Sequence, residues 1–244
     1  DQGIRYFDTA PPYGLGASES VLGEALEGRQ ENVIVATKAG LARPASPGLL
    51  QKARAVVKPM ARWVPGLRQA VLRGMALRAP AGNFDAGFIA RSFETSLRQL
   101  RRERVDCLLL HEAQADDTLA PLQELLDRCI EQGRLGAYGS STGEPMNQLV
   151  RFGAVSQYRS PAPGAEWTPV APADVLHGAL RFVAPSIGPA MERDPQLKAR
   201  LASLLPAGTD PASATGSLAL AYALARFESR LLISTREPQR LIRT

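Results

Sequence analysis

IRYFDTAPPYG, at residues 4–14, is the stretch around which the rest of the chain is arranged. Ile4 to Phe7 are typical of a short buried strand, and Asp8 follows directly. A turn rich in proline and glycine then carries Tyr13. Ser18 is predicted to cap a helix that runs to about Leu26. An acid therefore ends a strand and a tyrosine lies on the next loop, at the end of the strand where α/β proteins usually place their chemistry.

Strand-like and helix-like segments alternate along the rest of the chain. Further strands are predicted at 32–38, 105–111, 135–142, 154–158, 175–183 and 230–234. Helices are predicted at 85–102, 119–131, 145–152, 195–205, 212–226 and from 238 onward. Alternation of this kind implies a parallel sheet with helical crossovers. A doubly wound sheet and a (β/α)8 TIM barrel both fit, and seven strands favour a barrel that lacks its first strand, as a single domain over residues 1–244.

The composition is that of an ordinary globular protein, with 45% hydrophobic and 22% charged residues. No stretch approaches the ~18 apolar residues of a membrane span, and no secretory signal is visible. We therefore expect a cytoplasmic protein without a transmembrane segment. Cys107 and Cys129 are predicted to be reduced core thiols. Two cysteines and two histidines without close spacing predict no metal site.

A basic insertion interrupts the alternation at residues 41–84, after what would be the third barrel strand. It contains eight lysines and arginines and no acid, so the net charge of +5 for the chain becomes −3 without it. A wall or lid of a substrate pocket is the interpretation that we favour, because the insertion leaves the face where the strands end. A basic surface for membrane or nucleic acid and a solvated structural excursion are the alternatives. No nucleic-acid partner is expected.

Four side chains stand at or just beyond predicted strand ends: Asp8, Tyr13, Lys38 and His111. Each alone has an ordinary structural explanation, but in a parallel barrel these strand ends converge on one face. A phenol has a pKa of about 10, and a nearby ammonium lowers it. Lys38 could act in this way with Asp8 as its counter-ion, while His111 hydrogen-bonds a carbonyl oxygen. Because no nucleophile is present, hydride from a nicotinamide is the natural attacking group.

These residues lie in motifs that resemble the aldo-keto reductase family. The matching stretches are Gly3–Ala10, Tyr13-Gly14, Ser18-Glu19, Leu22-Gly23, Val35–Lys38, Ser96–Leu100, Val105-Asp106 and Leu109–His111. The resemblance implies a (β/α)8 barrel that binds NAD(P)H without a Rossmann domain. It also implies Tyr13 as the general acid, Lys38 and Asp8 as the pair that tunes it, and His111 as the group that orients the carbonyl.

The same resemblance suggests the cofactor contacts. Ser140 or Ser141, together with Gln157, resemble the positions that bind the nicotinamide carboxamide, although Thr142 replaces the asparagine that is usual in the family. The stretch STREPQRL, at residues 234–241, resembles the segment that binds the adenosine end. Its candidate contacts are Ser234, Thr235, Arg236 and Arg240. Because a guanidinium binds phosphate bidentately, the two arginines favour NADP(H) over NAD(H).

The predicted protein is therefore an NADP-dependent oxidoreductase that reduces an aldehyde or ketone to an alcohol. A catalytically weak or inactive barrel that senses cofactor or binds a partner is the alternative, but such a module has no need of a tyrosine proton donor. A hairpin and the first barrel strand are expected upstream of Asp1. The sequence identifies neither the carbonyl substrate nor the oligomeric state.

Overall fold

The computed structural model describes residues 3–29, 33–44, 82–114, 119–143, 150–161, 174–203, 205–226 and 228–235. The chain divides into two compact units. Residues 5–113 and 117–138 form the N-terminal unit, and the C-terminal unit lies mainly at 139–244. The predicted single domain over residues 1–244 stays a prediction.

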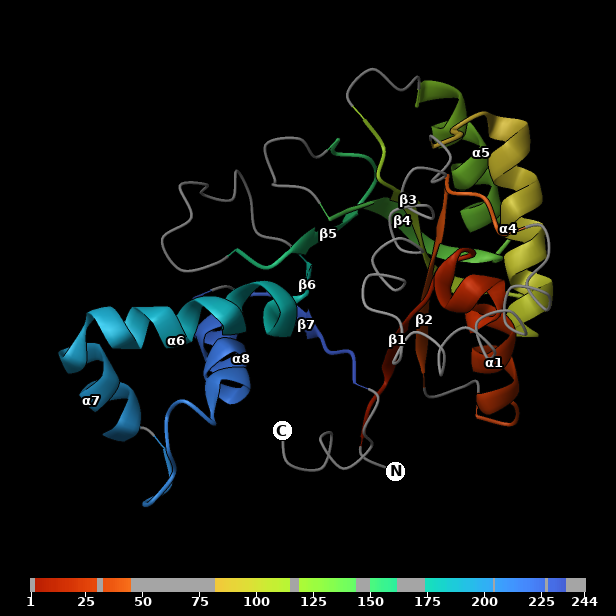
Figure 1. Ribbon diagram of the computed structural model, residues 1–244. Coiled ribbons are helices and arrows are strands. Elements are labelled where there is room, and N and C mark those ends of the chain that lie inside the picture. The colour runs from red at the N-terminus through yellow and green to blue at the C-terminus, as the bar shows by residue number, and fades with distance from the viewer. Residues whose placement is uncertain are drawn as a thin grey trace, which may run out of the picture. The chain divides into compact units, whose positions relative to one another are not determined.

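Seven strands are present in the described residues, and they follow one another in the sheet in chain order (Figure 1). They are β1 (Tyr6–Asp8), β2 (Ile34–Ala39), β3 (Val105–His111), β4 (Leu135–Thr142), β5 (Val155–Arg159), β6 (Val175–His177) and β7 (Arg230–Leu232). The pairings β1–β2, β2–β3, β4–β5, β5–β6 and β6–β7 are all parallel. Parallel strands in this order, alternating with helices, confirm the predicted α/β class of the (β/α)8 barrel type.

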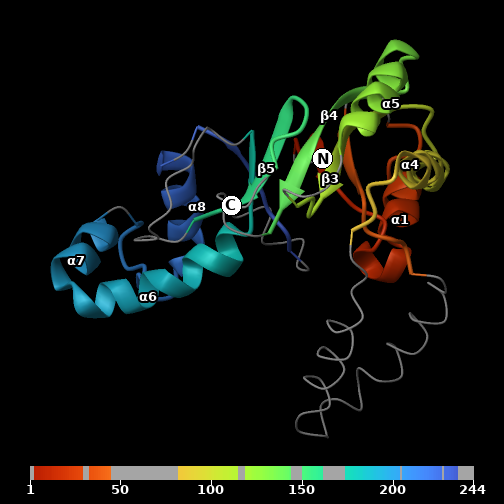
Figure 2. The ribbon, with the colours of Figure 1, turned by 90° about the horizontal axis from the view of Figure 1, so that it is seen from above.

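The helices of the N-terminal unit cover one face of its strands. They are the short 3-10 helix η1 (Tyr13–Gly16), α1 (Ser18–Ala25), α4 (Ala86–Leu100) and α5 (Ala120–Glu131). Helices α1, α4 and α5 lie on the same side of β1, β2 and β3 in both views (Figures 1 and 2). The opposite face and the carboxyl ends of these strands therefore remain for the site.

Helix α4 shows why this layer forms. Ile89, Phe93 and Leu97 recur at helical spacing and are all buried, so the helix has one apolar stripe against the sheet. The Asp85 carboxylate caps its first turn by accepting a hydrogen bond from the Phe88 N–H at 2.9 Å. Arg101 adopts the left-handed conformation that commonly ends a helix.

The C-terminal unit has its own apolar core. Its helices are the π-helix η4 (Ala179–Val183), α6 (Ala184–Arg193), α7 (Pro195–Ser203) and α8 (Thr215–Arg226). Val183, Ile187, Met191 and Ala219 are buried together between η4, α6 and α8. Across the described residues, every helix is too short or too polar to cross a membrane.

Two local predictions are wrong. Residues 175–183 form only the three-residue strand β6 before η4 begins, because Gly178 turns into the left-handed region with φ +77°. Helix α6 was therefore missed. Ser18 is the first residue of α1 rather than its cap, and Ala17 precedes it without a side-chain hydrogen bond. The helix predicted at 145–152 falls mostly outside the described residues, and the one from 238 lies wholly outside them.

Gly23 allows α1 to approach the end of α4. A Cβ atom on Gly23 would stand 2.6 Å from the backbone carbonyl oxygens of Gln99 and Leu100. We expect Gly23→Ala to lower the free energy of unfolding by about 1–3 kcal/mol, because neither backbone can move away cheaply. Urea unfolding measures this change.

Gly216→Ala is the matched control. Gly216 is also helical, and its added Cβ would make an ordinary 3.5 Å contact with the side chain of Leu180. This variant is expected to gain about 0.5–1 kcal/mol from helix propensity. Equal effects of the two substitutions would contradict the close approach of α1 and α4.

Candidate active site

Lys38 lies at the end of β2 with its side chain fully buried. Its Nζ donates to both carboxylate oxygens of Asp8, at 2.7 and 2.6 Å, and to the carbonyl oxygen of Thr9 at 3.1 Å. A buried ammonium requires acceptors of this kind, since each of its three N–H groups must be paired. The parallel register, which sets Asp8 beside Ala36, brings the carboxylate within reach of Lys38.

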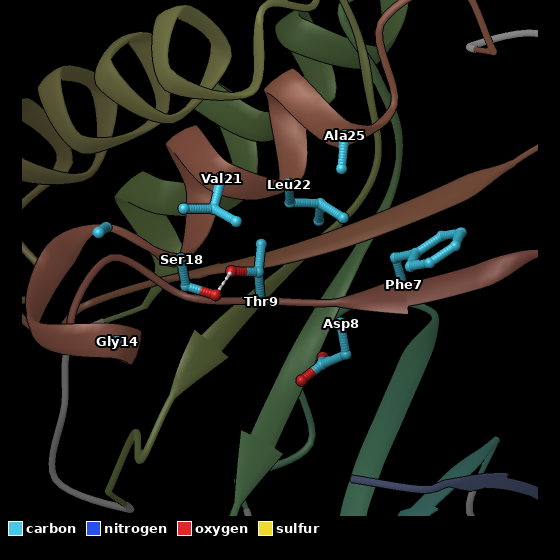
Figure 3. A pocket seen from close by; sticks show the side chains of 9 residues that line it. Phe7, Asp8, Thr9, Gly14, Ser18, Val21, Leu22 and Ala25 are labelled. Atoms are coloured by element: carbon cyan, nitrogen blue, oxygen red, sulfur yellow. Dashed lines mark hydrogen bonds between the residues drawn. The ribbon is translucent and has the colours of Figure 1, made fainter. Parts of the chain in front are cut away.

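The alternation of side chains along β1 directs Asp8 away from α1. Figure 3 shows Phe7 and Thr9 on the side of α1 and Asp8 on the opposite side. The Thr9 hydroxyl donates to the Ser18 hydroxyl at 3.0 Å, which ties the strand to the start of the helix. Asp8 is thereby kept on the face that carries Lys38.

Tyr13 begins η1 and lies against the same lysine. The Nζ of Lys38 is 4.9 Å from the centre of the Tyr13 ring. The His111 ring, at the end of β3, meets the Tyr13 ring edge to face, with the ring centres 5.8 Å apart and the planes at 84°. Tyr13 remains 38% exposed, whereas His111 is 8% exposed. The structure thus brings together the four side chains that the sequence selected.

The pKa of Tyr13 differs from the one expected from the sequence. The pKa of Tyr13 is raised above its ordinary value, first because the phenol is partly removed from water and then because Asp8 and Glu112 are negative. A lowered pKa of Tyr13 is therefore not what this structure gives, because burial and the two negative charges raise it. Burial also lowers the pKa of Lys38, and the attraction of Asp8 opposes that effect.

Two acids near this cluster, Glu112 and Glu19, had no role assigned to them from the sequence. Glu112 directly follows His111 and adopts a positive φ of 61°, and its charge acts on both Tyr13 and Lys38. Its position next to a strand-end histidine could have marked it. Glu19 is completely buried, and only the fold shows its partners.

The candidate cofactor residues Ser140, Ser141 and Gln157 lie in the C-terminal unit. The register pairs Ser141 with Gln157, so their side chains share one face of the sheet. Ser140 belongs to the other face, and its hydroxyl donates to the carbonyl oxygen of Val150 at 2.6 Å. Ser141 is therefore the better candidate of the two serines.

The buried side chain of Gln157 indicates a binding site for a ligand. It is 2% exposed, and its Oε1 atom has no hydrogen-bond partner among the residues that the structure describes. A buried carbonyl oxygen of this kind is unusual, and the NH₂ group of a nicotinamide carboxamide would satisfy it. The residues present thus fit the group that the resemblance implies.

Only part of the predicted adenosine-binding stretch can be placed. Ser234 and Thr235 follow β7, whereas Arg236 and Arg240 lie outside the described residues. In the described part of the chain, no three His, Cys, Asp or Glu side chains gather as a metal site would require.

Both ends of the basic insertion meet at the carboxyl end of β2. The Asn83 N–H donates to the Gly40 carbonyl oxygen at 2.8 Å. The Phe84 ring packs on Gly40, where an added Cβ would come within 2.4 Å of it. The insertion therefore starts and ends beside Lys38, while residues 45–81 lie outside the described residues.

A hollow of about 500 Å³ lies between β1 and α1. Phe7, Val21, Leu22 and Ala25 give it a largely apolar lining (Figure 3). Asp8 is part of its lining, whereas Tyr13, Lys38 and His111 are not, so the hollow borders the polar cluster at Asp8.

A family model described as the aldo/keto reductase family matches residues 1–156, which include the whole cluster. The chain belongs to this family. It is 31% identical over 158 residues to D-threo-aldose 1-dehydrogenase from a Pseudomonas species, covering 62% of this chain and 44% of that protein. It is 33% identical over 115 residues to pyridoxal 4-dehydrogenase from Microbacterium luteolum, covering 46% of this chain and 31% of that protein. The matches span less than half the length of these relatives.

Solved structures with the same fold are also aldo-keto reductases. AKR11C1 from Bacillus halodurans, in its holo form, matches with a TM-score of 0.61 and 19% identity, over 99% of this chain and 76% of that one. The aldo-keto reductase from Klebsiella pneumoniae in complex with NADPH matches with a TM-score of 0.56 and 15% identity, over 99% of this chain and 73% of that one.

The raised pKa of Tyr13 predicts its behaviour in alkali. An ordinary tyrosine is half ionised at about pH 10, whereas we expect the Tyr13 phenol to stay protonated there. The measurement is a phenolate absorbance titration of the native protein and of Tyr13→Phe, whose difference isolates one phenol. A difference signal with a midpoint at pH 10 or below would contradict the structure.

The raised pKa of Tyr13 also makes the free energy of unfolding depend on pH. Above about pH 10 the unfolded chain loses the Tyr13 proton before the folded chain does, so the free energy of unfolding falls as the pH rises. This part of the alkaline loss should be absent in Tyr13→Phe. The lowered pKa of Lys38 acts in the opposite direction, but it is common to both proteins in the comparison.

Proposed function

We propose that this aldo-keto reductase reduces an aldehyde or ketone to an alcohol with NAD(P)H, and that Tyr13 is the general acid. The observation that carries the proposal is the cluster itself. Lys38 is buried against Asp8, and its ammonium lies 4.9 Å from the centre of the Tyr13 ring, which also meets His111. A phenol, an ammonium and an imidazole around one position are suited to polarising and protonating a carbonyl oxygen.

Tyr13 supplies the proton to the carbonyl oxygen. Its raised pKa keeps the phenol protonated at neutral pH, so the donor form is always present. The phenol is a weak acid toward a neutral carbonyl, but an alkoxide is more basic than a phenolate. The proton therefore moves to the oxygen as negative charge develops there, and the products are a C–H bond and an O–H bond.

His111 acts on the oxygen that accepts the proton, and Lys38 acts on the phenol that donates it. His111 is placed to direct the carbonyl oxygen toward the Tyr13 hydroxyl and to stabilise the developing charge by a hydrogen bond. The Lys38 ammonium stabilises the phenolate that remains on Tyr13 after the proton has left. Asp8 holds the ammonium in place through its two short hydrogen bonds.

A reduced nicotinamide supplies the hydride to the carbonyl carbon when it is bound. Gln157 and Ser141 would hold its carboxamide, because Gln157 Oε1 is buried without a partner in the described part of the chain and Ser141 lies beside it on the same face. Ser234 and Thr235 would contact the adenosine end. Arg236 and Arg240 favour NADP(H), since a 2′-phosphate matches a guanidinium.

We place this chemistry in the cytoplasm, with a small carbonyl compound as the substrate. Cys107 and Cys129 are both buried and are thiols rather than disulfide-bonded cysteines, which suits a reducing compartment.

Tyr13→Phe tests the proposal directly. It removes the proton donor but keeps the ring that meets Lys38 and His111, so we expect kcat with NADPH and a panel of aldehydes to fall by about 10²–10⁴-fold. Cofactor binding, followed by fluorescence titration, should change little.

Tyr138→Phe is the matched control, because the Tyr138 hydroxyl bonds Asp127 at 2.7 Å rather than any residue of the cluster. Its activity should stay near that of the native protein. A native protein that binds NADPH but is no more active than Tyr13→Phe would sink the reductase proposal.

Arg236→Ala tests the cofactor preference. Losing a charge-assisted contact to phosphate should raise the KM for NADPH by about 10–100-fold, while the KM for NADH stays nearly constant. Steady-state kinetics with both cofactors, and Arg230→Ala as the control, measure the difference. An equal rise for both cofactors would count against a 2′-phosphate contact.

A further inference from the structure

A second buried charge lies beside the cluster. Glu19, in the first turn of α1, is 0% exposed. One of its carboxylate oxygens accepts a hydrogen bond from the Thr37 hydroxyl at 2.6 Å, and the other is paired with the guanidinium of Arg43. Glu19 therefore joins the start of α1 to the end of β2 and to the segment that follows β2.

Arg43 makes a further contact with the loop that carries Tyr13. Its Nη1 donates to the carbonyl oxygen of Gly16 at 2.6 Å. The backbone just before this carbonyl is left-handed, with φ of +59° at both Gly14 and Leu15. For leucine that conformation is unfavourable, so the loop keeps its shape only while other contacts hold it.

These contacts connect the loop that carries Tyr13, the proposed acid, with the residue that precedes Lys38. Tyr13 starts the loop that Arg43 holds at Gly16, and its own N–H donates to the Ala10 carbonyl oxygen at 3.0 Å. Thr37, which Glu19 holds, is the residue before Lys38. A change in the Glu19–Arg43 pair would move the phenol and the ammonium relative to each other.

We propose that Arg43, through its pairing with Glu19 and Gly16, is a positioning residue that sets the Tyr13 hydroxyl against Lys38 for proton transfer. The activity part of this inference rests on the proposed reductase function. The placement of Tyr13 does not, because the ionisation of its phenol reports on it without any substrate.

Two substitutions and a matched control test the role. Arg43→Met keeps much of the side chain's length but removes the guanidinium, which leaves Glu19 buried without its counter-charge. Arg43→Lys keeps the charge but cannot reproduce the two-pronged contact to Glu19 and Gly16. Arg128→Met, which breaks the exposed pair of Arg128 and Glu124, is the control for the loss of an ion-paired arginine.

For Arg43→Met we expect kcat to fall by about 10–100-fold, because small misplacements of a reacting group are costly. KM should change by less than about threefold, since the residue touches no substrate. Arg43→Lys should recover part of the loss, and Arg128→Met should match the native protein. Circular dichroism and thermal unfolding establish that each variant is folded at the assay temperature.

The second readout is the titration of Tyr13, taken as the absorbance difference from the same protein with Tyr13→Phe added. In Arg43→Met the loosened loop exposes the phenol to water, so its midpoint should fall by about one pH unit or more toward that of an ordinary tyrosine. If Arg43→Met does not fold, Arg43→Lys should show a smaller shift in the same direction.

An unchanged Tyr13 titration in a folded Arg43 variant, with kcat within about twofold of Arg128→Met, would overturn the positioning role. If the native protein reduces no carbonyl compound, the proposed function fails, and the titration alone then decides whether Arg43 places Tyr13.

Discussion

A buried ammonium constrains this site more than any other group. Lys38 has no access to water, so its three N–H groups need acceptors, and Asp8 and the Thr9 carbonyl provide them. That requirement sets β1 next to β2 in one register and leaves Asp8 on a single face of the strand. Tyr13 lies against this ammonium, and the His111 ring lies against Tyr13.

Burial and negative charge around Tyr13 determine the pKa of its phenol. Next to an unpaired ammonium a phenol would ionise more readily, whereas here burial and two carboxylates keep the Tyr13 proton in place. The Tyr13 phenol is therefore still protonated at a pH where an ordinary tyrosine has begun to ionise. A second buried charge, Glu19, is paired with Arg43, and Arg43 in turn contacts the loop that carries Tyr13 at the Gly16 carbonyl oxygen.

Regular elements could be predicted wherever the periodicity was long. Helix α4 and strand β3 begin and end within two residues of the expected positions, since their apolar side chains recur with a clear period over many residues. The short elements were less certain. Gly178 ends β6 after three residues through a positive φ that composition does not reveal, and η4 and α6 then occupy what an apolar run had suggested was a strand.

The sequence by itself determined the parallel α/β class, the family and the four polar residues at strand ends, because each depends on local pattern and chain order. Only the tertiary structure decided how those residues interact. It paired Lys38 with Asp8, raised the pKa of Tyr13 instead of lowering it, and joined Glu19 to Thr37 and Arg43. Burial and charge at a given atom come from residues far apart in the chain, and local sequence carries no measure of either.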